Sequence, residues 1–596
     1  MIKVSDYIIK FINEDMDVKN IFMLAGGGWM HLLNSLGENK NINYICNLHE
    51  QGAAIAAEAY GQYTNNIGVA MVTTGPGGTN AITGVAAGWI DSTPMMIISG
   101  QVKRADMILD KNLRQLGAQE VNIIPIVTPI TKYAVSVMEP EKIKYHLQKA
   151  YHMATTGRKG PVWLDIPLDI QGAIVDENKL EEFIPNEEKK LDINYFNEKI
   201  KTVINLINSS KRPVFFIGNG VCLSNAQNQF LELAKILNIP VLTTWKTIDL
   251  LEEANPLFIG RPGSIASRGA NFNLQNSDLF ISIGARMDLP QVAFNHKNFA
   301  KNAKKIIVDI DENEINKLNI NVDVKVVCDA KIFINELYKN KEKILYKDNG
   351  WINFCKNLLN KYPLVLKEYL QLKNYVNSYV LTDILSKEMS ENDILVPGSS
   401  GSCSEVTCQS FKVKKGQVVL NNQGLGSMGF GLPASIGACI ASGKKRTVCI
   451  NGDGGFFLNI QELEVVKRLN LPIKYFILNN DGYGSIRNMQ NNHFNGNYVG
   501  SGRTSGVTLP NIQKISEAYG IKSSKIDNQE NINDKIREIL NYEGPYIFEI
   551  MIDPNQQTQP RVSSKKLENG SMMSMPIENM YPFLSEEELE ENIIKK

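Results

Sequence analysis

The chain has 596 residues and a mass of 66.6 kDa, which is too long for one hydrophobic core, so about three to five domains are expected. Its 63 basic and 63 acidic side chains balance, and no bulk charge favours nucleic acid or an anionic membrane as a partner. The eight cysteines contain no CxxC pair, so we expect reduced core residues rather than disulfides or a zinc site. No signal peptide or membrane-spanning stretch is evident, and we expect a cytoplasmic protein.

We expect residues 1–185 to form a first α/β domain. An amphipathic helix at 5–13 precedes a strand at 21–24, and the strand runs into a glycine run that includes Gly27 and Gly28. Glycines after a strand can bind a nucleotide phosphate, although the GxGxxG spacing is absent here. Gly27 and Gly28 are therefore candidate cofactor-binding residues.

The next strand, at 44–48, ends at His49 and Glu50, and an alanine-rich helix follows. Because alanine-rich helices pack closely, we expect the carboxyl group of Glu50 to be largely buried. Such an acid can share a proton with the ring nitrogen of a ligand. The alternative is an acid that stabilises a helix N-terminus by about 0.3–1 kcal/mol. We expect His49 to lie on the other side of the strand and to be structural.

A second domain is expected at 186–345, after a charged linker, NEEKKLDINYFNEK, at 186–199. The segments RPVFFIGNG, IPVLTTWK, SDLFISIGAR and KKIIVDIDENEI follow at regular intervals and predict another parallel sheet. Five residues at the strand ends are candidates for a nucleotide site: Gly218, Gly220, Gly284, Arg286 and Asp311. Since doubly wound domains place glycine at strand ends in any case, an ordinary fold without a nucleotide remains the alternative.

The third domain is expected at 365–555 and contains the stretch RTVCINGDGGFFLNIQELEVVKRLNLPIKYFILNNDGYGSIR. A β-branched run, a glycine-rich turn, a helical pattern at 461–469 and a second apolar run at 473–478 predict strand, turn, helix and parallel strand. A right-handed crossover places both strands in one sheet, so Asp453 and Asn480 face one crevice. The polar tail, 556–596, either folds over the active site or has no fixed structure.

A carboxylate and an amide oxygen at one crevice suit Mg²⁺, which prefers oxygen ligands and keeps phosphate and water among them. Together with the carbonyl group of Gly482, Asp453 and Asn480 form the predicted metal site. Backbone amides can approach a diphosphate at the glycines of the turn, beside a helix N-terminus; these are Gly452, Gly454 and Gly455. An ordinary βαβ unit with a glycine-rich turn is the alternative.

GDG followed by 24 residues and then NN resembles the cofactor motif of thiamine-diphosphate (ThDP) enzymes. The segments HEQGAAIAAEAYG, TTGPGGTNAITGVAAGWIDSTPMMIISGQV and GLGSMGFGLPA resemble the acetolactate synthase (acetohydroxyacid synthase) large-subunit branch. The resemblance covers residues 1–555 and implies three doubly wound parallel-sheet α/β domains in the order pyrimidine-binding, central and diphosphate-binding. It also implies ThDP and Mg²⁺ as cofactors, and a central domain that holds FAD in some members and ADP or nothing in others.

By this resemblance, Glu50 is the acid that activates the cofactor and Gln119 lies near the reacting carbon. Met428 is the wedge that bends the cofactor, and the carbonyl group of Gly426 accepts from its amino group. The remaining cofactor-binding candidates come from both cofactor-binding domains and are Thr74, Gly75, Pro76, Asn80, Gly398, Ser399, Ser400, Gly401, Ser402, Gly482, Tyr483 and Gly484. The resemblance further implies a homodimer or homotetramer in which Glu50 of one subunit faces Asp453 of another.

Three departures from the family pattern concern the second substrate. RMDLP places Pro290 where RFDDR has the arginine that holds a carboxylate, Met489 replaces the tryptophan of RQWQ, and Ala118 replaces a phenylalanine. Each change enlarges the pocket or makes it less suited to an anion. We therefore predict decarboxylation of a 2-oxo acid, with pyruvate as first candidate, and transfer of the acyl unit to a bulky ketone such as a nucleotide-linked ketosugar.

Other functions stay open from the sequence. A true acetolactate synthase would join two pyruvates, with Arg286 or Arg268 replacing the missing cation. A 2-oxo acid decarboxylase or an FAD-linked oxidase would use no carbonyl acceptor. A non-catalytic ThDP-binding protein is a further alternative, and the presence of Glu50 argues against it.

Overall fold

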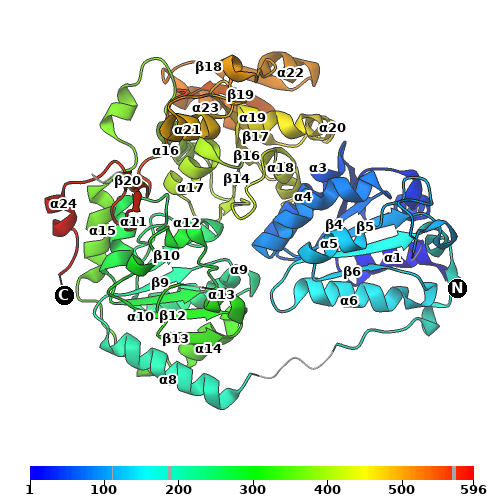
Figure 1. Ribbon diagram of the computed structural model, residues 1–596, viewed down its shortest axis with the longest axis horizontal. Coiled ribbons are helices and arrows are strands. Elements are labelled where there is room, and N and C mark those ends of the chain that lie inside the picture. The colour runs from blue at the N-terminus through cyan, green and yellow to red at the C-terminus, as the bar shows by residue number, and fades with distance from the viewer. Residues whose placement is uncertain (110–111, 186–190, 318, 567–571, 596) are drawn as a thin grey trace.

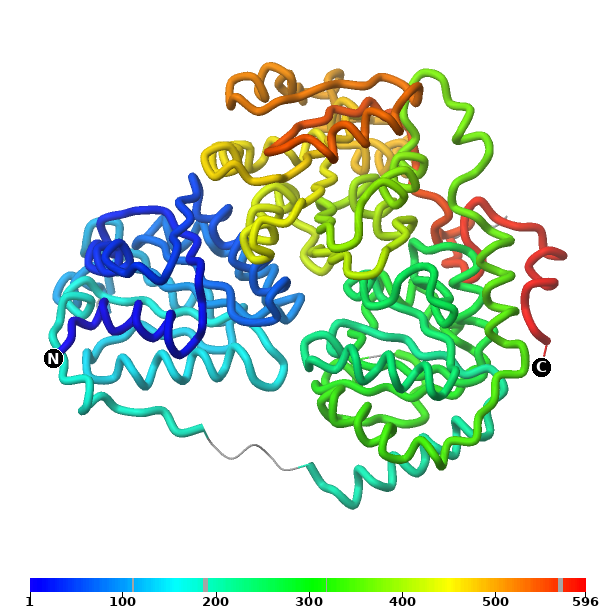
Figure 2. Tube along the Cα trace, turned by 180° about the vertical axis from the view of Figure 1, so that it is seen from behind, coloured from blue at the N-terminus to red at the C-terminus, as the bar shows by residue number. Residues whose placement is uncertain are grey.

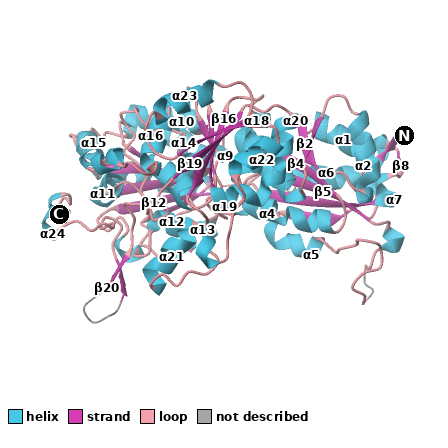
Figure 3. Ribbon diagram, turned by 90° about the horizontal axis from the view of Figure 1, so that it is seen from above, coloured by secondary structure: helices cyan, strands magenta, loops and turns pink. Residues whose placement is uncertain are grey.

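The computed structural model describes residues 1–109, 112–185, 191–317, 319–566 and 572–595. This part of the chain contains three parallel sheets, each covered by helices on both faces (Figures 1 and 3). Buried apolar side chains on each face of each sheet explain this arrangement, because a parallel sheet is stable only where both faces are covered. The predicted α/β class, with three doubly wound parallel-sheet domains, is confirmed.

The sheet of the first domain has six strands. In spatial order they are β3 (Asn43–Cys46), β2 (Asn20–Met23), β4 (Gly68–Val72), β5 (Met95–Gln101), β7 (Pro161–Pro167) and β6 (Tyr133–Ser136). The main helices around it are α1 (Val4–Glu14), α2 (Met30–Glu38), α3 (Glu50–Thr64), α4 (Pro76–Asp91) and α6 (Ile143–Thr155). The predicted helix at 5–13 and strand at 21–24 are therefore present, with ends displaced by one residue.

The central sheet has five strands. In spatial order they are β10 (Val241–Thr243), β9 (Pro213–Ile217), β11 (Leu279–Ile283), β12 (Lys304–Asp309) and β13 (Val324–Val327). Its helices include α8 (Ile193–Ser209), α10 (Gln227–Leu237), α11 (Arg268–Asn276), α12 (Leu289–Val292), α13 (Glu312–Asn316), α14 (Ala330–Lys339) and α15 (Trp351–Lys361). The linker predicted at 186–199 is wrong for its second half, because α8 begins at Ile193 and buries Phe196 and Ile200 against the central core.

The sheet of the third domain again has six strands. In spatial order they are β15 (Val418–Val419), β14 (Ile394–Pro397), β16 (Thr447–Gly452), β17 (Ile473–Asn479), β19 (Tyr546–Met551) and β18 (Lys522–Ile526). Its helices include α16 (Ser378–Glu388), α18 (Gly431–Ala441), α19 (Asp453–Phe456), α20 (Leu463–Arg468), α21 (Gly484–Phe494), α22 (Ile512–Ala518) and α23 (Ile532–Asn541). The helix predicted at 461–469 is shorter than expected, since residues 457–462 form a 3-10 helix before α20.

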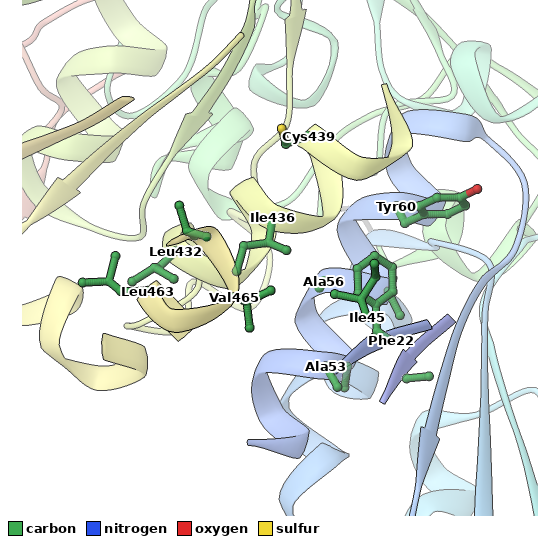
Figure 4. Close-up of a cluster of buried hydrophobic side chains, with 14 of the residues drawn as sticks. Phe22, Ile45, Ala53, Ala56, Tyr60, Leu432, Ile436, Cys439, Leu463 and Val465 are labelled. Carbon is green, nitrogen blue, oxygen red and sulfur yellow. The ribbon is translucent and has the colours of Figure 1, made fainter. Parts of the chain in front are cut away.

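The first and third domains share one hydrophobic core where α3 packs on α18 (Figure 4). Small side chains on α3, Ala53 and Ala56, face Ile436 and its neighbours on α18. A Cβ atom at Gly437 would lie 2.1 Å from the Ala56 carbonyl oxygen, so only glycine allows this close approach. The alanine-rich composition of α3 thus serves a contact between two domains.

The C-terminal tail packs on the central domain (Figure 2). Ile577 and Met580 join its core, and the Asn271 side-chain amide donates to the Ile577 carbonyl group at 2.8 Å. Neither expectation for the tail, a lid or an unstructured segment, describes this part of it. Earlier in the tail, β20 (Ser564–Lys566) and β21 (Met572–Ser574) form an antiparallel pair (Figure 3).

None of the helices in the described part of the chain combines the length and the apolar character that a membrane crossing requires. The eight cysteines are free thiols, and six of them are buried. This agrees with the expectation that they are reduced core residues.

Candidate active site

The predicted site residues lie at the carboxyl ends of strands where each sheet changes its winding direction. In the first sheet this point lies between β2, followed by Gly27 and Gly28, and β4, followed by Thr74. In the third sheet it lies between β14, followed by Gly398, and β16, followed by Asp453. Ligands of doubly wound folds bind in the crevices outside such points. The structure therefore assembles each half of the predicted site at the place where this fold binds ligands.

Asp453 is buried at the end of β16 and is held by backbone amides. Its Oδ1 accepts from the Gly454 amide and its Oδ2 from the Gly482 amide, each at 2.9 Å. Burial raises the pKa of Asp453 to about 6, and these backbone hydrogen bonds only partly offset the loss of hydration. A cation beside this carboxylate would favour its charged form.

Asn480 presents a buried oxygen atom at the end of the neighbouring strand. β16 and β17 pair with Gly452 opposite Leu478, so Asp453 and Asn480 follow the same edge of the sheet. The Asn480 Oδ1 atom is buried and has no hydrogen-bond partner in the described part of the chain, a condition that few buried polar atoms tolerate. Asp453, Asn480 and the Gly482 turn fit Mg²⁺ because they offer oxygen ligands of the kind it prefers.

The loop after β14 lies beside this turn and is built from unusual backbone conformations. Ser400 and Gly401 have positive φ angles of 64° and 60°, and the Ser399 hydroxyl is buried without a partner in the described residues. Ser402 begins a π-helix, Ser402–Val406. Local π-helical turns often occur at functional sites, and the unpaired hydroxyl fits an anion such as a diphosphate.

Glycines of the GDG turn and of the segment after Asn480 permit close packing. A Cβ atom at Gly454 would lie 2.4 Å from the Tyr483 ring, and one at Gly484 would lie 2.4 Å from the Asn480 side-chain nitrogen. A Cβ atom at Gly452 would meet nothing within 4 Å. Gly454 and Gly484 are therefore needed for packing, whereas a Cβ atom at Gly452 would meet open space.

The loop between β15 and α18 contains Gly426 and Met428. Gly426 has a φ of 62°, and its amide donates to the Asn422 carbonyl oxygen at 3.0 Å. Met428 is partly exposed, and the Ser427 hydroxyl is buried without a partner in the described residues. This loop is therefore fixed at Asn422 and leaves the Met428 side chain accessible.

Glu50 is the first residue of α3 and is only 6% exposed. Its Oε2 atom accepts a hydrogen bond from the Asn80 side-chain amide at 3.0 Å. The position predicted for His49 is wrong: β3 ends at Cys46, and His49 caps α3 by accepting from the Gln51 amide at 3.1 Å. The helix thus has a separate capping residue, so the buried carboxyl group of Glu50 is not required as a cap.

The Thr74–Gly75 turn, the first turn of α4 and Gln119 lie together near Glu50. Gly75 has a φ of 65°, and a Cβ atom there would lie 2.1 Å from the Gln119 carbonyl oxygen. The Thr74 hydroxyl donates to Gln101 Oε1 at 2.8 Å, and Pro76 begins α4. Gln119 itself is exposed and has a φ of 61°. These contacts bring the predicted residues of the first domain into one cluster.

Comparisons with known proteins agree with this geometry. Residues 2–124, 200–337 and 399–550 match the N-terminal TPP binding domain, the central domain and the C-terminal TPP binding domain of thiamine pyrophosphate enzymes. A probable acetolactate synthase large subunit of Methanococcus aeolicus is 33% identical over 93% of both chains. The chain belongs to the ThDP enzymes, in the acetolactate synthase-like branch. The predicted family is confirmed, and the chain is an enzyme of this family.

Two further relatives support membership in this branch of ThDP enzymes. The acetolactate synthase large subunit of Cyanidium caldarium is 32% identical over 94% of both chains. That of Lactococcus lactis subsp. lactis is 30% identical over 92% of both chains. The similarity therefore extends over all three domains.

Glu462 was not singled out from the sequence, although it connects the two cofactor-binding domains of this ThDP enzyme. Its carboxylate accepts from the Asn47 side chain at 2.8 Å and from the Leu48 and His49 amides at 3.1 Å each. Burial raises the pKa of Glu462, and these hydrogen bonds counteract the rise. The sequence feature that could have identified Glu462 is an acidic residue within the apolar helical pattern that follows the GDG turn.

A cavity of about 330 Å³ lies between the first and central domains of the enzyme. Its lining includes four of the five predicted nucleotide-site residues: Gly218, Gly220, Gly284 and Arg286. Asp311 is not among the lining residues; it pairs with Arg158 at 2.8 Å and caps α13. A Cβ atom at Gly220 would lie 2.7 Å from the Gly284 Cα atom, so close packing of the two turns already requires glycine.

Proposed function

We propose that the enzyme uses ThDP and Mg²⁺ to decarboxylate a 2-oxo acid, with pyruvate as the first candidate, and joins the acyl unit to a carbonyl acceptor. The observation that carries this proposal is the buried carboxyl group of Glu50, held by Asn80 at the carboxyl edge of the first sheet. An acid in such a place can share a proton with a ligand ring nitrogen. Release of CO₂ from pyruvate, dependent on both ThDP and Mg²⁺, tests it.

Each cofactor-binding domain contributes different groups. Asp453 and Asn480, with the Gly482 turn, would hold Mg²⁺, and the Gly398–Ser402 loop would bind the diphosphate. Glu50 would hold the proton at the pyrimidine ring, while Gln119 would lie near the substrate. When bound, ThDP supplies the electron sink that lets carbon dioxide leave the 2-oxo acid. In this proposal, Glu50 of one subunit faces Asp453 of a second copy, so the active enzyme is a homodimer or a homotetramer.

For the acceptor we propose a bulky ketone such as a nucleotide-linked ketosugar. The family's arginine that binds the carboxylate of the second substrate is missing here. The two arginines that could replace it, Arg268 and Arg286, already make hydrogen bonds within the protein. Arg268 is buried and donates to the carbonyl groups of Met580 and Pro582, and Arg286 donates to Ile90 and Asp288. Pro290 lies in α12 and offers no side-chain donor. These contacts favour an acceptor without a carboxylate next to its carbonyl group.

The second candidate is a true acetolactate synthase, which the names of the relatives favour. Product analysis with labelled pyruvate separates the candidates. Acetolactate formed from pyruvate alone supports the second candidate, and a labelled adduct that requires an added ketosugar supports the first. Acetaldehyde or acetate as the main product would instead indicate a decarboxylase or an oxidase.

We also propose that the cavity between the first and central domains binds a nucleotide, and FAD is the candidate to test first. Its volume of about 330 Å³ is at the lower end of the range for ligand pockets. Lys159 provides a cation at its wall and donates to Asn65, whereas Arg158 and Arg286 at the same wall are paired with carboxylates. A flavin absorption band in the purified protein would support FAD; a colourless protein that binds ADP would support an adenine nucleotide without flavin.

A further inference from the structure

The three domains meet at a polar cluster that surrounds Lys246 and includes Asp91, the last residue of α4. Lys246 belongs to the central domain, directly after β10. Its ammonium group donates to Gln62 at 2.8 Å and to Asp91 at 3.1 Å in the first domain, and to the Asn421 carbonyl group at 2.5 Å in the third. One cation thus contacts all three domains.

The contacts on the third domain converge on two buried asparagines. The Asn421 side chain donates to the Trp245 carbonyl group at 2.9 Å, and the Asn422 side chain donates to Asp91 at 2.9 Å. Lys246 and Asp91 therefore hold the same pair of residues from two sides. Asp91 is 6% exposed in its side chain and Lys246 is 17% exposed, so water competes little for these hydrogen bonds.

Asn421 and Asn422 begin the loop that carries Gly426 and Met428. The Asn422 carbonyl oxygen accepts from the Gly426 amide at 3.0 Å, so a shift of Asn422 moves the loop directly. A Cβ atom at Gly424 would lie 2.4 Å from Asp91 Oδ1, which leaves no room between this loop and the end of α4. The same α4 begins at Pro76, next to the Glu50 cluster. Within one chain, the cluster therefore connects two groups of residues that we assign to cofactor binding, and in the proposed dimer these two groups belong to different active sites.

We propose that Lys246 is a positioning residue for the Asn421–Met428 loop, and that it acts through Asp91 and Asn421. The expected effect on catalysis rests on the proposed function, whereas the expected effect on the loop's structure does not. Without the ammonium group, the Asn421 carbonyl loses its donor and Asp91 is left as a buried carboxylate without its cation. The loop then has alternative positions, and Gly426 and Met428 no longer hold one arrangement against the cofactor.

The structural test uses hydrogen exchange of the protein without cofactor. In Lys246→Met, amides of residues 422–428 should exchange about tenfold faster, the effect of losing one hydrogen bond to a charged group. Amides of β16 and α19 should be unchanged. Lys246→Arg should restore protection. The double variant Lys246→Met/Asp91→Asn removes both charges, and keeps the test valid if the single variant fails to fold.

Arg261→Met is the matched control. Arg261 is also a buried cation of the central domain that contacts the third domain, but it donates to the Cys408 and Phe411 carbonyl groups instead of the loop. The Arg261→Met substitution should leave the exchange rates of the amides of residues 422–428 unchanged. Unaltered exchange in Lys246→Met and in the double variant, the same change in Arg261→Met, or no restoration by Lys246→Arg overturns the proposal.

The catalytic test measures kcat and KM for the 2-oxo acid together with the near-ultraviolet circular dichroism of bound ThDP. We expect kcat to fall about tenfold in Lys246→Met, with KM nearly unchanged, because the loop contacts cofactor and not substrate. The dichroism of the bound cofactor should change, and Lys246→Arg should recover both. A raised KM with constant kcat and an unchanged spectrum overturns the positioning role. An inactive wild-type protein whose loop still responds in the exchange experiment would refute the proposed function and leave the structural proposal standing.

Discussion

The Asn47 side chain donates a 2.8 Å hydrogen bond to Glu462, although the two residues are 415 positions apart in the chain. Asn47 follows β3 and lies just before Glu50, and Glu462 lies between the GDG turn and α20. The same carboxylate accepts from the Leu48 amide at 3.1 Å. The third domain thus fixes the segment that leads into the proposed proton-holding residue.

Replacing Glu462 with alanine tests this connection. The buried Asn47 side chain and the partly buried Leu48 and His49 amides lose their acceptor. Because an unsatisfied buried group costs about 1–3 kcal/mol, we expect a loss of about that size in the free energy of unfolding. Urea unfolding monitored by circular dichroism measures it. Glu464→Ala, two positions along the same segment, is the control and should change the stability by less than about 0.5 kcal/mol. Equal effects of the two substitutions would contradict the role of Glu462.

Glu50→Gln tests the proposed acid without changing the shape of the side chain. The amide cannot hold the proton, so CO₂ release should fall by about 10²–10⁴-fold, the usual contribution of a general acid or base. Binding of ThDP, measured by fluorescence titration, should persist because the proposed metal ligands lie in another domain. Glu139→Gln, on the surface of the same domain, should keep activity. Loss of ThDP binding in Glu50→Gln, or retained turnover, would refute the assignment.

Asp453→Asn and Asn480→Ala test the metal site. Asp453→Asn removes the negative charge and one carboxylate oxygen, and Asn480→Ala removes the amide oxygen. We expect the half-saturating Mg²⁺ concentration to rise about tenfold or more, since loss of even an outer partner commonly costs 10–100-fold in metal affinity. Activity titrated against added Mg²⁺ after chelator treatment provides the measurement. Asp481→Asn is the control, because Asp481 is exposed and pairs with Arg503 at 3.3 Å. A Mg²⁺ dependence that is unchanged in both site variants would exclude this location.

The placement of Asp453 and Asn480 along one edge of the sheet could be predicted from the sequence, because β16 and β17 are consecutive along the chain and adjacent in the sheet. The right-handed crossover rule alone then predicts that Asp453 and Asn480 lie at the same edge of the sheet. Glu462 and Lys246 could not be predicted in this way, since their partners belong to other domains and no local pattern specifies which domain surfaces meet. The start of α8 was missed because its charged exposed face obscured the apolar positions that begin at Phe196.

Glu58 on α3 makes the stability of the fold depend on pH. Burial raises its pKa from 4.5 to about 7, with Lys246 and hydrogen bonds from Thr93 and Gln62 opposing the rise. The folded chain therefore binds more protons at this group than the unfolded chain between pH 4.5 and 7. The free energy of unfolding consequently falls as the pH rises through this range, by up to about 3 kcal/mol from this residue.

Glu58→Gln removes the charge that is costly above pH 7. We expect the variant to gain stability relative to the wild type as the pH rises, with a small or negative difference near pH 5 and the largest gain near pH 8. Other buried carboxyl groups with raised pKa values, such as Asp165 and Asp249 at about 6, are present in both proteins and cancel in the comparison. Thermal unfolding at both pH values measures the difference, and Glu391→Gln on the surface controls for the change in net charge. A gain that is constant with pH, or one that is larger at pH 5, would show that Glu58 does not carry this proton.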